Sequence, residues 1–151
     1  MRWRVQRGST VVLAAVIALV PSACSSGAES VPPACLEGTA AVLRALAAAP
    51  SPVRVDGVRI SRCFARRSGA GDIESMGAPL VDAASRLAAG ARADPHGAQA
   101  TELGYLIGAA ERGAARTEGI HYELVRRLES EASGVDSAEF RAGESAGRRF
   151  G

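Results

Sequence analysis

The chain's 151 residues are enough for one domain, and 18 basic against 16 acidic residues give a formal net charge of +2. All 18 basic residues are arginine, so chemistry that needs a lysine, such as a Schiff base or a phosphate-loop lysine, is excluded. Only 4% of the residues are aromatic, which leaves few platforms for stacking nucleic-acid bases.

The first two dozen residues have the pattern of an export signal. A basic start over residues 1–7 precedes an apolar run without charge from Thr10 to Val20. This run is too short for a membrane-spanning helix, which needs about 20 residues. We therefore expect residues 1–23 to be a signal peptide and the protein to be extracytoplasmic.

Ser22-Ala23-Cys24 ends this leader and resembles the end of a bacterial lipoprotein lipobox. In that family the cysteine receives a diacylglyceryl group and becomes the first residue, which implies a cell-membrane anchor through lipid on Cys24. The resemblance covers the N-terminus alone, and Pro21 stands where the family usually has an aliphatic residue. The alternative is ordinary secretory cleavage after Ala28, which would leave a secreted protein beginning at Glu29.

Export changes both the charge and the cysteine balance of the chain. Loss of the leader removes three of the 18 arginines and leaves 15 against 16 acidic residues, a formal charge of −1. A near-neutral protein lacks the positive field that nucleic acid requires, so we expect no nucleic-acid partner. Cys24 is either lipidated or cleaved away, and Cys35 and Cys63 remain. An oxidising compartment favours a disulfide between them, and two separate buried thiols are the alternative.

The first part of the mature chain is predicted to be a tether followed by a helix. Residues 24–31 are mostly small and polar, which is typical of a flexible tether. The helical domain begins at Pro32, because proline fits the first turn of a helix. Apolar residues at helical spacing predict one helix over residues 34–48.

Residues 53–60 are the one stretch with a β-like pattern, because apolar and charged residues alternate there. Asp56-Gly57 suits a type I′ turn, so this stretch is either a short hairpin or an extended loop. Ser61 is expected to cap a short helix over residues 62–67.

A long helix is predicted over residues 72–93, where large apolar residues recur every three or four positions. Asp72 is the expected N-cap of this helix. Pro79 is expected either to kink the helix or to mark its true start.

Two more helical regions are predicted over residues 98–116 and 118–132. Gly113 and Gly119 either separate these regions or lie in one bent helix. Residues 133–151 are rich in glycine, serine and charge, and we expect a mostly disordered tail there. The fold class is therefore all-α, a small bundle of three to five helices over residues 32–132.

Ala100, Gly104 and Gly108 lie four residues apart on one face of the helix predicted over 98–116. Small residues at this spacing let two helix backbones approach closely. They indicate either tight packing inside the bundle or the face of a homodimer.

His121 is the ionisable residue that most invites a functional interpretation. Glu118 precedes it by three residues and shares its helix face, which makes the two weak candidates for metal ligands. A zinc site usually takes three or four protein ligands, and apolar residues follow His121 at helical spacing. We therefore expect a histidine at the edge of the core, with no metal and no cofactor.

The sequence contains no pattern of catalytic residues that indicates an enzyme. It lacks the Gly-x-Ser-x-Gly motif, and neither histidine has a serine and an acid in a suitable context. We expect a non-catalytic structural or interaction module of the cell envelope that presents its last two helices, over residues 98–116 and 118–132, to an envelope protein. A homodimer through the face of Ala100, Gly104 and Gly108 is the other partner to consider. The alternative is a small-ligand or metal-binding lipoprotein that uses the same helices.

Overall fold

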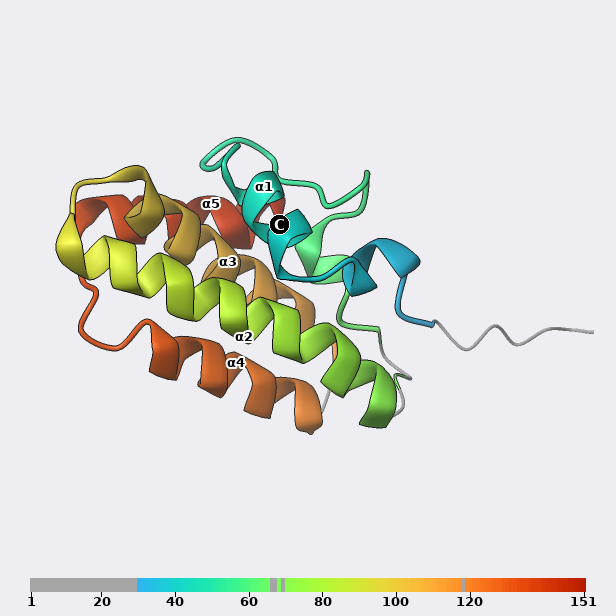
Figure 1. Ribbon diagram of the computed structural model, residues 1–151. Coiled ribbons are helices and arrows are strands. Elements are labelled where there is room, and N and C mark those ends of the chain that lie inside the picture. The colour runs from blue at the N-terminus through green and yellow to red at the C-terminus, as the bar shows by residue number, and fades with distance from the viewer. Residues whose placement is uncertain (1–29, 66–67, 69, 118) are drawn as a thin grey trace, which may run out of the picture.

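Five α-helices and two short 3-10 helices make up the part of the chain that this computed structural model describes, residues 30–151 without 66–67, 69 and 118. In chain order the elements are η1 (Pro33–Leu36), α1 (Thr39–Leu46), η2 (Ile60–Arg62), α2 (Ala70–Ala93), α3 (Ala98–Ala114), α4 (Ile120–Glu131) and α5 (Ala138–Phe150). The predicted all-α bundle is therefore confirmed (Figure 1). The predicted signal peptide, Cys24 and most of the tether lie outside the described residues.

Helix α3 lies at the centre of the bundle and packs against each of the other four α-helices. Every residue from Leu103 to Ala110 is buried, as expected for a helix that is apolar on all its faces. Tyr105 is fully buried, and its hydroxyl oxygen accepts a hydrogen bond of 3.0 Å from the backbone N–H of Val53. This bond attaches the segment that follows α1 to the centre of the molecule.

The helix predicted over residues 34–48 is in fact two elements, η1 and α1. Gly38, which lies between them, has a φ of 86°, a backbone conformation that side-chain-bearing residues rarely adopt. Helix α1 buries Val42 and Leu46 and packs on α2. The glycine therefore changes the direction of the chain so that a separate apolar face reaches the core.

The stretch over residues 53–60 forms a minimal hairpin. Val55 and Val58 form one antiparallel bridge with hydrogen bonds of 2.8 and 2.9 Å in the two directions. Asp56 and Gly57 between them both have positive φ, 42° and 78°, as a type I′ turn requires. Val53 and Val55 are buried, so packing on the helices supports a turn that would be marginal alone.

The predicted disulfide between Cys35 and Cys63 is present, with 5.6 Å between the two Cα atoms. It joins η1 to the residue that follows η2. Ser61 does not cap a helix, because residues 63–65 are not helical; residues 66–67, the end of the expected helix, lie outside the described residues. Ser61 lies within η2, and its hydroxyl donates a hydrogen bond of 2.7 Å to the main-chain oxygen of Gly151.

Helix α2 begins at Ala70, upstream of its predicted cap, so Asp72 lies in the first turn. The helix continues through Pro79, which neither starts nor ends it. Proline removes one backbone hydrogen bond to the residue four positions earlier, here Ser75. Ser75 is exposed, so water can replace that bond. Among the described helices, none has both the length and the apolar character needed to cross a membrane.

Helices α3 and α4 are separate helices rather than one bent helix. Gly119 has a φ of 72° and directly precedes α4, whereas Gly113 lies inside α3. Helix α4 packs against both α2 and α3, and it buries Leu124 and Leu128 on that side. The first of these two leucines lies against Gly77 of α2.

The prediction that residues 133–151 form a disordered tail is wrong, because α5 occupies most of this segment. The hydroxyl oxygen of Ser137 caps the helix by accepting a hydrogen bond of 3.1 Å from the N–H of Phe140. Glu139 lies in the first turn and Arg148 and Arg149 in the last, which suits the helix dipole at both ends. The helical domain therefore extends well beyond residue 132.

Candidate functional site

Gly104 and Gly108 lie against the backbone of α5 rather than on a free surface. A Cβ atom at Gly104 would overlap the carbonyl oxygen of Phe140, and one at Gly108 would overlap that of Glu144. Ala100, one turn earlier, is fully buried. Of the two interpretations of these small residues, packing inside the bundle is the one that the structure shows.

Helix α5 contributes a matching row of glycines that the sequence interpretation missed. Gly143, Gly147 and Gly151 also lie four residues apart. A Cβ at Gly143 would overlap the carbonyl oxygen of Thr101, and one at Gly147 would overlap that of Tyr105. We call these glycines of α3 and α5 the glycine seam. Its sequence signal was the same four-residue spacing, present within a segment too poor in large apolar residues to indicate a packed helix.

The C-terminal end of α5 is held by side chains from elsewhere in the fold. Nη1 of Arg112 donates hydrogen bonds to the carbonyl oxygens of Arg148 at 2.8 Å and Arg149 at 2.6 Å. Ser61 binds the main-chain oxygen of Gly151, as described above. These bonds satisfy carbonyl groups that a helix end leaves without a partner inside the helix.

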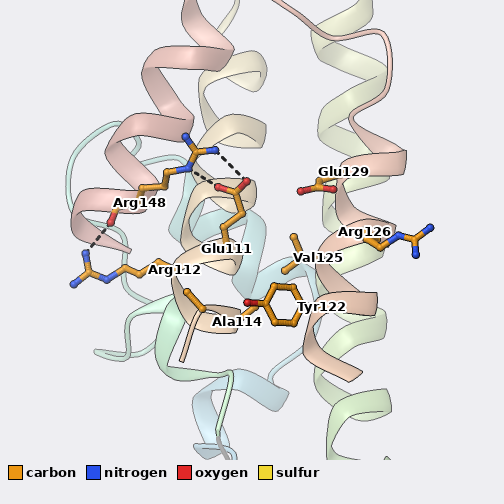
Figure 2. A pocket seen from close by; sticks show the side chains of 9 residues that line it. Glu111, Arg112, Ala114, Tyr122, Val125, Arg126, Glu129 and Arg148 are labelled. Atoms are coloured by element: carbon orange, nitrogen blue, oxygen red, sulfur yellow. Dashed lines mark hydrogen bonds and ion pairs between the residues drawn. The ribbon is translucent and has the colours of Figure 1, made fainter. Parts of the chain in front are cut away.

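A groove of about 560 Å³ separates α4 from the edge formed by α3 and α5 (Figure 2). Its base consists of the buried residues Ala114 and Val125, and the exposed Ala115 adds to its apolar lining. Its charged and aromatic lining comes from both edges and comprises Glu111, Arg112, Tyr122, Arg126, Glu129 and Arg148. An apolar base with a few polar groups around it is the usual chemistry of a binding groove.

A fork of hydrogen bonds fixes the α3–α5 edge of the groove. Nε and Nη2 of Arg148 lie 2.6 and 3.0 Å from the two carboxylate oxygens of Glu111, and Nη2 also lies 2.7 Å from Glu144. The hydrogen bond with Glu111 raises the pKa of Arg148 above its ordinary value, with a smaller contribution from the nearby charges of Glu144 and Glu129. Charge-assisted hydrogen bonds therefore hold this edge together, and its main charges neutralise one another.

The α4 edge of the groove has no comparable ion pair that holds its charged groups in place. In Figure 2 the carboxylate of Glu129 points toward the opposite edge and the hydroxyl of Tyr122 points across the groove, whereas the guanidinium of Arg126 points outward. Tyr122 is 53% exposed, which is high for a large aromatic residue. Within the described residues, Glu129 forms no hydrogen bond or ion pair, and the one partner of Arg126 is Glu123 at 4.0 Å.

One histidine is buried and the other is exposed, and neither belongs to a metal site in the described part of the chain. His121 is 3% exposed, and its ring centroid lies 5.8 Å from that of Phe64. His96 is a surface residue whose Nδ1 lies 3.2 Å from both carboxylate oxygens of Glu139. Among the described residues no three histidine, cysteine or acidic side chains gather where a metal could bind, and Glu118 lies outside those residues.

The sequence did not single out the groove residues Arg148 and Tyr122. Arg148 had no readable signal, because its helix was expected to be disordered. Tyr122 had one, since it is an aromatic residue on the charged side of the helix over 118–132. Comparisons of the chain with models of protein families, with curated proteins and with solved structures found no match.

Proposed function

We propose that this protein is an exported, lipid-anchored cell-envelope protein that acts as a non-catalytic interaction module. The observation that carries the proposal is the groove between α4 and the α3–α5 edge, with a half-exposed tyrosine at its side. The proposal places the partner on the last helices of the domain.

The leader and the cysteines support the location outside the cytoplasm. Thr10 to Val20 is an uncharged apolar run that ends close to Cys24. The disulfide between Cys35 and Cys63 is compatible with an oxidising compartment. Lipid on Cys24 would hold the domain at a membrane surface through the tether, since two or more acyl chains give a stable anchor.

The residues of the groove support a role in docking. Protein interfaces are enriched in tyrosine and arginine and have an apolar centre within a polar rim. The groove has this arrangement, because Val125 in its lining is buried and Tyr122 and Arg126 on the same helix are exposed. Ile120, at the start of the same helix, is 51% exposed and adds apolar surface beside it.

Site-specific photo-cross-linking of the full chain in its native cells tests this proposal. The photoreactive residue p-benzoylphenylalanine replaces Tyr122 in one strain and Ser85, an exposed residue of α2 away from the groove lining, in the control strain. We expect a discrete adduct in the membrane fraction from position 122 that Glu129→Arg weakens. Position 122 yielding no adduct beyond that of position 85 would contradict the docking role.

A further inference from the structure

We propose that the occupant of the groove is a second copy of this chain, with the two α4 helices antiparallel about a two-fold axis near Val125 and Arg126. This inference rests on the proposed docking role of the groove and specifies the partner. Two-fold dimers are the commonest oligomers, and each copy offers the same patch to the other.

The first observation is the stripe that α4 presents to the groove. Tyr122, Arg126 and Glu129 are its exposed members, at steps of four and three residues, so they lie on one face of the helix, and Val125 is buried beside them. The side of α4 that carries Leu124 and Leu128 is already covered, because it packs on α2 and α3. The three exposed residues therefore belong to the part of α4 that a partner can reach.

The second observation is that this stripe complements its own reverse. Tyr122 offers a hydroxyl donor at one end, and Glu129 offers a carboxylate acceptor at the other, with Val125 and Arg126 between them. When two such helices run antiparallel, the hydroxyl of Tyr122 meets the carboxylate of Glu129 of the second copy. Arg126 lies one turn from Tyr122, so its guanidinium also reaches that carboxylate. Because the dimer is two-fold symmetric, each of these contacts occurs twice.

The third observation is the balance of charge in the groove. Its lining holds two acidic residues and three arginines. Glu111 and Arg148 bind each other, and Arg112 binds backbone carbonyls. Arg126 has only a 4.0 Å contact with Glu123, and Glu129 acts on Arg148 only through its charge, so these two are the most weakly held charges of the lining. One charge of each sign favours a partner with the same two charges in reverse order over a strongly acidic or basic one.

A contact based on one pair of short helices buries less than the roughly 1,600 Å² of a standard protein interface. We therefore expect a weak dimer in solution. Confinement of two anchored copies to one membrane surface raises their effective concentration and favours the dimer there.

Light scattering after size-exclusion chromatography of the exported protein, purified with its native N-terminus, tests the dimer over a range of concentrations. We expect the mass to rise from monomer to dimer with concentration. Arg126→Glu and Glu129→Arg should each raise the dissociation constant by about tenfold or more. The double variant with both changes should restore it, because the exchanged charges meet again across the axis. Circular dichroism establishes that each variant is folded.

Disulfide trapping tests the same geometry without relying on charge reversal. Arg126→Cys lies near the proposed axis, so two copies should oxidise to a covalent dimer that reductant separates. Ser85→Cys, exposed on α2, is the control and should form little dimer. A monomer at every concentration, or equal trapping at positions 126 and 85, would overturn the proposal.

The failure of this inference can be told apart from failure of the docking role. If position 122 cross-links to a different envelope protein and the purified chain remains a monomer, the groove docks a partner but not a second copy. If position 122 gives no adduct above its control, the docking role and this inference fail together.

Discussion

At Gly104 and Gly147 the backbones of α3 and α5 lie closer together than any side chain would permit. Built Cβ atoms at these positions overlap carbonyl oxygens of the facing helix, which are backbone atoms and cannot rotate away. Close backbone contact gives many dispersion contacts along the whole length of two helices. Each glycine of the seam is therefore required for space, not for its conformational freedom.

Replacing Gly104 with alanine tests this requirement. We expect Gly104→Ala to lower the free energy of unfolding by about 1–3 kcal/mol, because the added methyl group forces α5 away from α3. Gly71→Ala is the matched control, since a Cβ at Gly71 meets nothing within 4 Å and alanine favours a helix. Urea denaturation of both variants measures the difference. If Gly104→Ala were as stable as Gly71→Ala, the seam would not be tight.

Tyr105 provides the second test at the scale of single residues. Tyr105→Phe removes the acceptor of the buried N–H of Val53, and we expect a loss of about 1–2 kcal/mol in the free energy of unfolding. Tyr122→Phe removes the same hydroxyl from a half-exposed side chain and should cost close to nothing. Equal losses in the two variants, again by urea denaturation, would show that the buried hydrogen bond stabilises the fold no more than the exposed hydroxyl does.

Among the elements, α5 differs most from what the sequence indicated. The buried residues of α5 are Gly143, Ala146 and Gly147, so it lacks the row of large apolar residues by which a helix is recognised. Helices α2 and α3 have that row and were predicted within a few residues of their ends. The division of the first helix at Gly38 was also missed, because a positive φ leaves no mark in a pattern of hydrophobicity.

The N-terminal end of α5 should respond to acid. The helix backbone at Glu139, and then His96, hold the pKa of the Glu139 carboxyl below its ordinary value of 4.5. A carboxyl whose pKa is lowered in the folded state stabilises it above the unfolded-state pKa and loses this contribution as the pH falls through the folded-state pKa. We expect the stability of the wild type to fall more steeply below about pH 5 than that of Glu139→Gln.

Thermal melts of both proteins between neutral and acidic pH measure that difference. His96→Ala is the companion variant and should keep part of the acid response, because the backbone contribution to the pKa of Glu139 remains. Parallel stability curves for the wild type and Glu139→Gln would contradict the assignment.

At the scale of the whole molecule, the sequence predicted the class of fold and the disulfide, but not the groove. The disulfide followed from counting cysteines after export, and with a sequence separation of 28 residues it stabilises the fold by about 3–4 kcal/mol. The groove depends on α5, because Arg148 completes one edge of it. Without a packed α5, the sequence predicted only that the last two helices face a partner, and it did not predict a groove. Tyr122 was the one member whose position on a polar face was visible in the sequence.

The claim on which the rest depends is that the chain is exported and held to a membrane through Cys24. The mass of the intact protein from its native membrane, measured with and without reductant, tests this claim most directly. We predict a chain that begins at Cys24, carries acyl groups, and gains the mass of two hydrogen atoms when the disulfide between Cys35 and Cys63 is reduced. A chain that begins at Met1, or one that begins at Glu29 without lipid, would contradict the anchored protein proposed here.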